Sequence, residues 1–434
     1  MMKTIDTLPN ILGRVAGALA FMAGCLMASS CVQENIIDPT PEVTGDVWLS
    51  VDIANMAPGM TRAGEAPDDT ESHPEEDAEA AENYIDPSDV EVYILTSAGR
   101  LTRPFDKDKY SVTKQLEGVY RLTLQANAVN FDLSGDNVSF KILMIANLTG
   151  TGDGHTNLYT LADLNASLAD MTTLSDARSF GFQGNVDPSN QDFVQAPPKR
   201  IGSQNYLTAI PMSGIVTATV TKAALAGANT EANPVQLPTI YMMRALAQIR
   251  VVDAITNSSN ANAEGWHITY VHTTGVNKRG AYLPEIGASS PWLNGTSFLE
   301  NGFSLSSWYD PAMTIKTQKV TYTDAQGYVD QMQTSQTYPA FRCYVPELDR
   351  SAIAAGAKTP AVTIGVADTK GNTAVYTYEF PATRTENGTT VDFDFARNHI
   401  YQLVVTGVSA DKELTINYTI CPWDVKTTDI PEFN

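Results

Sequence analysis

Residues 47–63 read VWLSVDIANMAPGMTRA and combine a strand pattern with a single basic residue. Aliphatic residues occupy every second position up to Ile53, which is the period-two pattern of a strand with one buried face. The inward residues of this expected strand are Val47, Leu49, Val51 and Ile53. A Pro-Gly pair follows the strand, and Arg62 comes soon after it.

Arg62 borders a long acidic stretch, since residues 63–92 contain twelve Asp or Glu and no Lys or Arg. A trypsin-like protease would find Arg62 easily, because nicking concentrates in exposed polar loops. The sequence therefore predicts cleavage between Arg62 and Ala63. Such a cut would detach the apolar strand, residues 47–56, from everything that follows it.

Length and charge restrict the possible architectures and partners. The chain has 434 residues, of which 43% are apolar, and is long enough for two domains of roughly 150 to 200 residues. Its 28 Lys and Arg face 49 Asp and Glu, for a net charge of −21. Nucleic acid and anionic lipid both require basic patches, so this charge balance argues against either as a binding partner.

The N-terminus predicts a targeting signal over residues 1–30. An apolar run at residues 15–28 is shorter than a bilayer-spanning helix and leads through small residues into Cys31. This is the pattern of a bacterial lipoprotein signal, with cleavage before Cys31 and acylation of its thiol by a fatty acid such as palmitate. Cys25 is an alternative site, and an ordinary secretory signal is an alternative reading. Residues 31–62 would then form a tether and a cleavable propeptide strand.

The rest of the chain predicts an all-β fold. Many short apolar or alternating segments separated by turn residues favour β-sandwiches over a parallel sheet. One short amphipathic helix is expected at residues 160–175. The small, proline-interrupted segment GANTEANPVQLP at residues 227–238 places a boundary between an N-terminal domain, 63–232, and a C-terminal domain, 233–434.

Catalytic and metal-binding patterns are mostly missing from the sequence. His267 and His272 lie five positions apart on one expected strand, so they point to opposite faces and cannot share a metal unless a bulge intervenes. Cys343 and Cys421 lack neighbours at metal-ligand spacing and are expected to be unpaired. The glycines of residues 150–155 lack the pattern of a phosphate-binding loop. We therefore expect a protein without catalytic residues, metal or cofactor.

Taken together, these features resemble the fimbrillins of Bacteroidales, pilin subunits that are built as lipoproteins and polymerised after proteolysis at the cell surface. The lipoprotein signal, the strand and the Arg62–Ala63 pair all match. The further matching stretches are DVEVYILTSAGRL from Asp89, IPMSG from Ile210, MRALAQIRV from Met243, YVPE from Tyr344, RNHIYQL from Arg397 and YTICPWDV from Tyr418. They span nearly the whole chain.

The resemblance implies two tandem transthyretin-like Greek-key β-sandwiches, an outer-membrane lipoprotein precursor, and cleavage after Arg62 by an Arg-specific protease. It also implies assembly into a fimbrium by donor-strand exchange with other copies or related subunits, in support of adhesion. Loss of residues 47–56 would expose an unpaired sheet edge and an apolar groove. A strand from a neighbouring subunit could fill both, and such a head-to-tail contact generates a filament.

The donor strand is expected near the C-terminus, within residues 424–434. Its candidate plugs are Val425, Ile430 and Phe433, although Pro431 restricts strand pairing there. The same tail could simply end a final strand, which leaves the position of the subunit in the fibre open.

Two other functions compete with this reading. The first is a monomeric cell-surface lipoprotein that binds glycans, with Trp266, Trp292 and Trp308 as stacking platforms. The second is a surface hydrolase, for which the sequence offers no nucleophile or metal constellation.

Overall fold

The computed structural model describes residues 42–55, 76–77, 82–95, 106–116, 118–148, 181–183, 200–201, 205–206, 210–255, 265–277, 279–283, 298–299, 303–305, 309–323, 329–348, 350, 359–386, 389–392, 395–409 and 411–424. The statements below concern these residues. Several predicted features lie outside them, namely Cys31, Arg62, Ala63, the helix expected at residues 160–175, and the tail residues Val425, Ile430 and Phe433.

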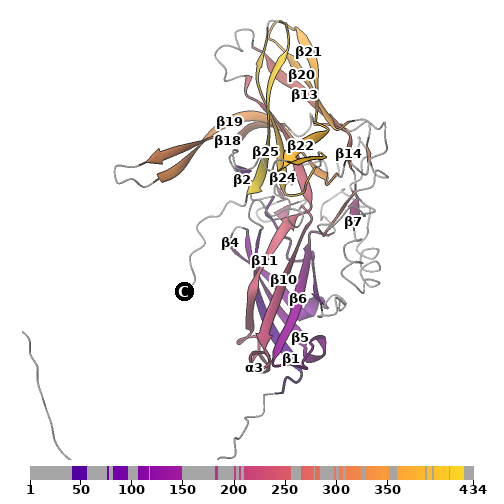
Figure 1. Ribbon diagram of the computed structural model, residues 1–434, viewed down its shortest axis with the longest axis vertical. Coiled ribbons are helices and arrows are strands. Elements are labelled where there is room, and N and C mark those ends of the chain that lie inside the picture. Colours follow the sequence, from indigo (N-terminus) through magenta and orange to yellow (C-terminus); the bar gives the residue numbers. More distant parts are fainter. Residues whose placement is uncertain are drawn as a thin grey trace, which may run out of the picture. The chain divides into compact units, whose positions relative to one another are not determined.

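The first half of the described chain forms a seven-stranded sheet (Figure 1). In sheet order its strands are β3 (Val90–Leu95), β6 (Asn137–Ala146), β10 (Met212–Thr221), β11 (Val235–Arg244), β1 (Asp46–Asn55), β5 (Val119–Asn127) and β4 (Tyr110–Leu116). β1 therefore lies inside the sheet, with a strand on either side.

β1 is paired along its length with both neighbours. It runs antiparallel to β5 from Asp46, opposite Asn127, to Ala54, opposite Val119. It runs parallel to β11, and this register shifts where Pro238 falls in β11. Proline cannot donate a backbone hydrogen bond, so it is tolerated in a sheet at such an irregularity.

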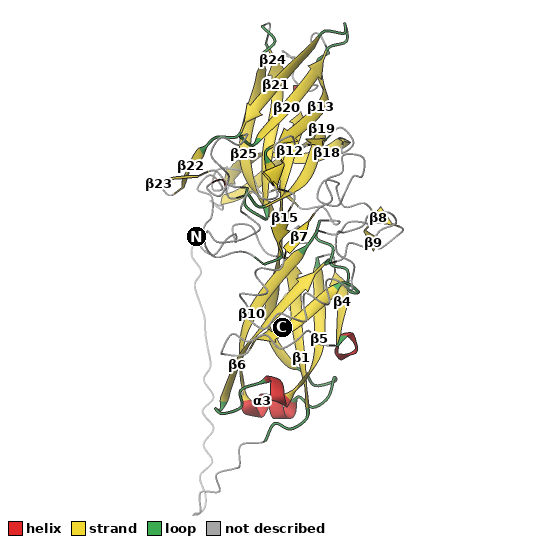
Figure 2. Ribbon diagram, turned by 90° about the vertical axis from the view of Figure 1, so that its right-hand side faces the viewer, coloured by secondary structure: helices red, strands yellow, loops and turns green. Residues whose placement is uncertain are grey.

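The sheet folds into two layers at the contact between β10 and β11. These strands pair at only two positions, Met212 with Arg244 and Ser213 with Met243. Gly214 permits the corner, because a Cβ at this position would lie 2.6 Å from the carbonyl oxygen of Tyr241. The layers are β3–β6–β10 and β11–β1–β5–β4, and Figure 2 labels β6 and β10 of the first layer and β1, β5 and β4 of the second.

A shared apolar core fills the space between the layers. Buried side chains from both layers form one cluster, including Leu49 of β1, Leu122 of β5, Ile142 of β6 and Ile240 of β11. The two outer strands also approach each other, since the Tyr110 hydroxyl donates to the carbonyl of Val90 at 2.6 Å. The first half is thus a nearly closed sandwich.

The second half of the described chain forms two further sheets around a second core. The six-stranded sheet has the order β18 (Tyr309–Thr323), β19 (Val329–Pro346), β12 (Leu246–Asp253), β24 (His399–Val408), β25 (Leu414–Asp424) and β2 (Glu76–Asp77). The four-stranded sheet has the order β17 (Phe303–Ser304), β13 (His267–Thr274), β20 (Ala361–Ala367) and β21 (Thr373–Glu379). Val251 and Leu403 from the larger sheet share the core with Val271 and Ile364 from the smaller one.

Short elements complete the described chain. The two-stranded pairs are β14 (Val276–Asn277) with β16 (Phe298–Leu299), β15 (Arg279–Ala281) with β7 (Gly181–Gln183), β22 (Thr383–Glu386) with β23 (Thr389–Asp392), and β8 (Arg200–Ile201) with β9 (Asn205–Tyr206). The helices are α3 (Lys222–Gly227) and the 3-10 turns η2 (Lys107–Lys109) and η3 (Ala128–Asn130).

The predicted all-β class is confirmed, with two differences in detail. β11 belongs to the first sheet although it lies beyond residue 232, where the sequence analysis ended the N-terminal domain. The polar, proline-rich composition of residues 227–238 suggested a linker, but the structure accommodates Pro238 at the irregular position of β11. β18 was not predicted, and its ladder with β19 continues beyond the residues that pair with β12 (Figure 1).

Candidate strand-exchange site

We call the space between β5 and β11 that β1 occupies the slot. The inward side chains of β1 fill it completely, because Val47 is 1% exposed and Leu49, Val51 and Ile53 are 0% exposed. Their neighbours in the core are aliphatic residues of β5, β6 and β11. The slot is therefore a continuous apolar groove that runs the length of the sandwich.

The outward face of β1 is more polar. Arg121 Nε of β5 donates to Asp52 Oδ1 at 2.9 Å, and both side chains are about half exposed. Asp46 accepts from Gln125 at 2.6 Å and from Asn127 at 3.4 Å. Exposed pairs of this kind contribute little to stability. Of the side chains of β1, the inward ones therefore stabilise its position most.

Both ends of β1 are fixed by the backbone. At its start, the amide of Ala128 donates to the carbonyl of Gly45 at 2.9 Å, and the amide of Trp48 donates to Ala228 at 2.8 Å. Gly45 has a φ of 80°, which favours glycine. At its end, Asn55 pairs with Met242 of β11. The predicted cleavage residue Arg62 lies seven positions further along the chain.

The chain after Arg62 is held by other parts of the protein. We call residues 82–86 the retained segment. Asn147 binds it twice, accepting from the Asp86 amide at 2.9 Å and donating to the Tyr84 carbonyl at 2.8 Å. The Tyr120 hydroxyl accepts from the amide of Ile85 at 3.0 Å. Further upstream, β2 pairs in parallel with the end of β25.

Arg244, the last residue of β11, joins the retained segment to the second sandwich. Its Nε donates to the carbonyl of Glu82 at 3.0 Å, and its two terminal nitrogens donate to Asn83 and, at 2.7 Å, to Asn398. The Arg244 side chain is among the largest fully buried ones. A buried guanidinium requires such acceptors, since burial of an unpaired charge is very costly.

The Glu82 carboxylate balances this region electrostatically. It is 0% exposed and accepts from Gln248 at 2.8 Å and from the Tyr344 hydroxyl. Arg342 lies 3.5 Å from the same Glu82 oxygen. The retained segment is thus anchored to β12 and β19 by side chains, as well as to β11 through Arg244.

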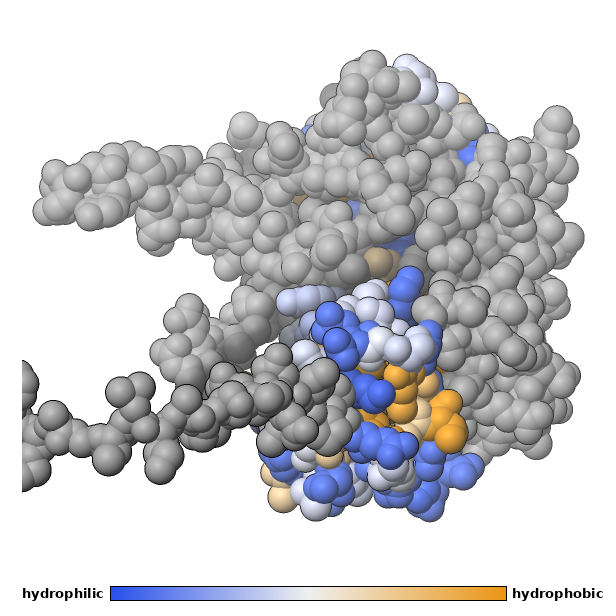
Figure 3. Space-filling view, turned by 60° about the horizontal axis from the view of Figure 1, so that its bottom comes forward, coloured by the Kyte–Doolittle hydropathy of each residue, from blue (hydrophilic) through white to orange (hydrophobic). Residues whose placement is uncertain are grey.

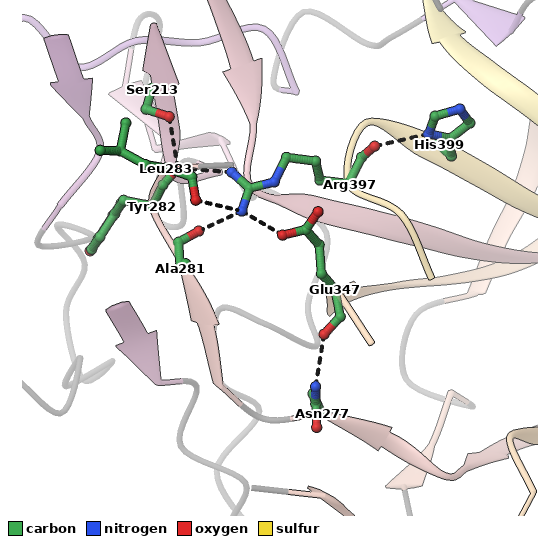
Figure 4. A network of polar contacts seen from close by, with 8 residues as sticks. All are labelled: Ser213, Asn277, Ala281, Tyr282, Leu283, Glu347, Arg397 and His399. Carbon is green, nitrogen blue, oxygen red and sulfur yellow. Dashed lines mark hydrogen bonds and ion pairs between the residues drawn. The ribbon is translucent and has the colours of Figure 1, made fainter. Parts of the chain in front are cut away.

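A second buried arginine, Arg397, binds the last residue of β15 and the two residues that follow it (Figure 4). It pairs with Glu347 at 2.6 Å and donates to the carbonyls of three consecutive residues, Ala281, Tyr282 and Leu283. Ser213 of β10 donates to the same Tyr282 carbonyl at 2.7 Å. This network therefore connects the corner strand β10 with residues next to β24.

The surface does not reveal the slot while β1 is in place. The exposed large apolar side chains among the described residues are Leu116, Val129, Ile215, Tyr241 and Val375. In Figure 3 the coloured surface of the described chain is largely hydrophilic around a smaller apolar area. The apolar face that would be available for exchange is that of the slot itself.

Among the comparisons with known proteins, only the comparison with solved structures gives matches. No protein-family model matches the sequence, and no curated protein is detectably related. In structure, the chain is similar to fimbrial and cell adhesion proteins of Bacteroidales. One is the C-terminally truncated tip fimbrial protein Mfa3 from Porphyromonas gingivalis, at 12% identity and a TM-score of 0.40, covering 87% of this chain and 100% of that one.

Two proposed cell adhesion proteins are similar to the same extent. The protein from Parabacteroides distasonis is 14% identical, with a TM-score of 0.43, and the match covers 89% of this chain and 99% of that one. The protein from Bacteroides eggerthii is 13% identical, with a TM-score of 0.42, covering 90% and 99%.

The structure brings together charged residues that no local sequence pattern singles out. Arg244, Glu82, Arg397 and Glu347 form the two buried networks, but each bonds partners far away in sequence. Arg244, Glu347 and Arg397 lie within stretches quoted for the resemblance, yet a local pattern cannot tell a buried charged residue from a surface one. The sequence therefore contains these charged residues in recognisable stretches but does not show that they are buried.

Other predicted chemistry is placed as follows. His267 is exposed and His272 is half-buried on β13, and no group of three potential metal ligands occurs in the described part of the chain. Cys343 is a free, fully buried thiol, and burial raises its pKa. Trp266 is 5% exposed and packs in the second core, so it is not a stacking platform. None of the described helices is long and apolar enough to cross a membrane.

Proposed function

We propose that this chain is a non-enzymatic fimbrial subunit that polymerises by donor-strand exchange at the slot. The observation that carries the proposal is the position of β1. It is a central strand with four fully buried aliphatic side chains, and it ends seven residues before the lone basic residue Arg62. The retained segment after Arg62 is held by contacts that do not involve β1.

Cleavage matters because it removes a tether. In the intact chain β1 is covalently attached, so its effective concentration at the slot exceeds that of any strand from another molecule. A cut between Arg62 and Ala63 leaves β1 bound only by non-covalent contacts. A donor strand from another molecule can then compete with β1 for the slot, because β1 no longer has the high effective concentration of a tethered strand.

The energetics favour exchange over simple loss of β1. Each buried aliphatic side chain contributes roughly 1.5–3 kcal/mol, so the four inward residues of β1 together contribute about 6–12 kcal/mol. An empty slot would lose this contribution and leave β5 and β11 with unpaired edges. A donor that enters as β1 leaves recovers most of it, and repetition of the step gives a head-to-tail filament.

The proposal includes the route to the cell surface. Acylation at Cys31 would attach the precursor to the outer membrane, where an Arg-specific protease could reach Arg62. Both residues lie outside the described part of the chain, and their roles rest on the sequence. The glycan-binding alternative gains no support from Trp266, whose side chain is buried.

The test uses the precursor without its signal peptide, treated with an Arg-specific protease. We expect a new N-terminus at Ala63, followed by oligomers that resist denaturant. The matched control is Arg62→Gln, which keeps the loop but removes the cleavage residue and should remain monomeric. Persistent monomer after complete cleavage at Arg62 would contradict the proposal.

A further inference from the structure

β11 depends on β1 for most of its place in the sheet. Six residues of β11, from Val235 to Met242, have register partners in β1. Only the last two, Met243 and Arg244, pair with β10. Among the described strands, β1 and β10 are the only two that pair with β11. When β1 leaves, the β11 backbone is therefore held by strand pairing at its C-terminal end alone.

That end carries Arg244, and three of its acceptors lie outside β1 and so remain when β1 leaves. Two belong to the retained segment, the Glu82 carbonyl and the Asn83 side chain. The third, Asn398, precedes β24 in the second sandwich. The retained segment is itself bound by Asn147. Arg244 thus connects the one secured end of β11 to three points that cleavage at Arg62 does not disturb.

We propose that Arg244 is a positioning residue for strand exchange, which keeps β11 in place as a wall of the emptied slot. This inference rests on the proposed donor-strand exchange. A wall that is already ordered spares the incoming strand the entropy cost of ordering it. Without the Arg244 contacts, β11 would have to regain both its position and its register as each donor binds.

A merely structural role makes a different prediction. If Arg244 only stabilised the fold, its replacement would weaken the intact and the emptied protein alike. If Arg244 positions β11, the intact protein keeps β11 ordered through β1, and the defect appears once the slot is empty. Amide hydrogen exchange of β11, read in both states, separates these possibilities.

The experiment compares three forms of the cleaved full chain: wild type, Arg244→Lys and the control Arg250→Lys. Arg250 is also a buried arginine, but it donates to Gln248 at 2.9 Å and Gln402 at 3.2 Å within the second sandwich. The released N-terminal fragment is removed in mild denaturant, and the chain is returned to buffer. A labelled peptide of residues 46–55, DVWLSVDIAN, is then titrated by fluorescence anisotropy.

We expect the wild type to bind the peptide, Arg250→Lys to bind within about twofold of it, and Arg244→Lys to bind at least about tenfold more weakly. The compact ammonium of lysine lacks the fork of donors with which the guanidinium reaches three separate acceptors. Amides of β11 should exchange faster in emptied Arg244→Lys than in emptied wild type, and equally in the intact forms. If Arg244→Lys does not fold, Asn398→Gly removes one acceptor at a residue whose φ of 60° glycine adopts readily.

The outcomes separate the two proposals. Equal peptide binding by wild type and Arg244→Lys would overturn the positioning role while leaving strand exchange intact. Failure of the wild type to bind the peptide would instead contradict strand exchange at the slot.

Discussion

Asp52 of β1 and Arg121 of β5 face each other across the antiparallel ladder, and Arg121 Nε donates to Asp52 Oδ1 at 2.9 Å. Both side chains are about half exposed, whereas the next residue of β1, Ile53, is 0% exposed. One strand thus presents a solvated ionic face and a dry apolar face. The two faces differ in what they contribute to stability.

The ionic face should contribute little. Replacing Asp52 with Asn removes the charge but keeps a hydrogen-bond acceptor opposite Arg121. We expect the free energy of unfolding to fall by less than about 1 kcal/mol, because solvent and salt screen exposed pairs. Urea denaturation of the intact chain measures the change. A loss several times larger would show that the outward face, and not the slot, holds β1.

The apolar face should contribute much more, and only before cleavage. Leu49→Ala in the intact chain should lower the free energy of unfolding by roughly 2–5 kcal/mol, because it leaves a cavity in the slot. In oligomers made from the cleaved variant, a donor replaces the altered strand, so their resistance to denaturant should equal that of wild type. Weakened Leu49→Ala oligomers would indicate that β1 stays in place.

Gly214 should be required at the corner between β10 and β11. A Cβ added there would lie 2.6 Å from both Ile240 Cγ2 and the Tyr241 carbonyl oxygen. We expect Gly214→Ala to lower the free energy of unfolding by about 1–3 kcal/mol through overpacking. Gly227→Ala is the matched control, since no atom lies within 4 Å of its added Cβ. Equal thermal melting of both variants would argue against a tight corner.

Because of Glu91, the first sandwich should be more stable in mild acid than at pH 8. Burial raises its pKa above 4.5, with Lys107 opposing and Asp89 reinforcing the shift. The contribution of a group with a raised folded pKa is fully present below the unfolded pKa and is lost as pH rises through the folded pKa. Glu91→Gln should therefore melt at a higher temperature than wild type at pH 8.

The same variant should lose its advantage near pH 4, where the wild-type carboxyl is protonated in both states. Thermal melting of both proteins across this range tests the sign. An advantage for Glu91→Gln that is constant with pH would show that its effect is steric and not electrostatic.

Several strands of the fold follow from local patterns. The alternation at Val47, Leu49, Val51 and Ile53 predicts β1 because one buried face imposes a period of two. The same reasoning missed β11, since Pro238 and its small polar neighbours resemble a linker. Whether such a proline interrupts a strand depends on the partner strand, and the local sequence does not contain that partner.

The buried networks could not be predicted for a related reason. Arg244 finds its acceptors 161 and 162 residues earlier in the chain and 154 residues later. Its local sequence, MRALAQIRV, suits an exposed arginine at a strand end equally well. Long-range partners decide the burial of a charge, whereas nearest neighbours largely decide the strand pattern.

The most direct measurement is the protein content of denaturant-resistant oligomers formed after cleavage at Arg62. Mass spectrometry of purified oligomers would detect the N-terminal fragment that carries residues 46–55. The account predicts that this fragment is absent from the oligomers and recovered in the soluble fraction. Oligomers that retain one fragment per subunit would contradict it, because β1 would then still occupy the slot.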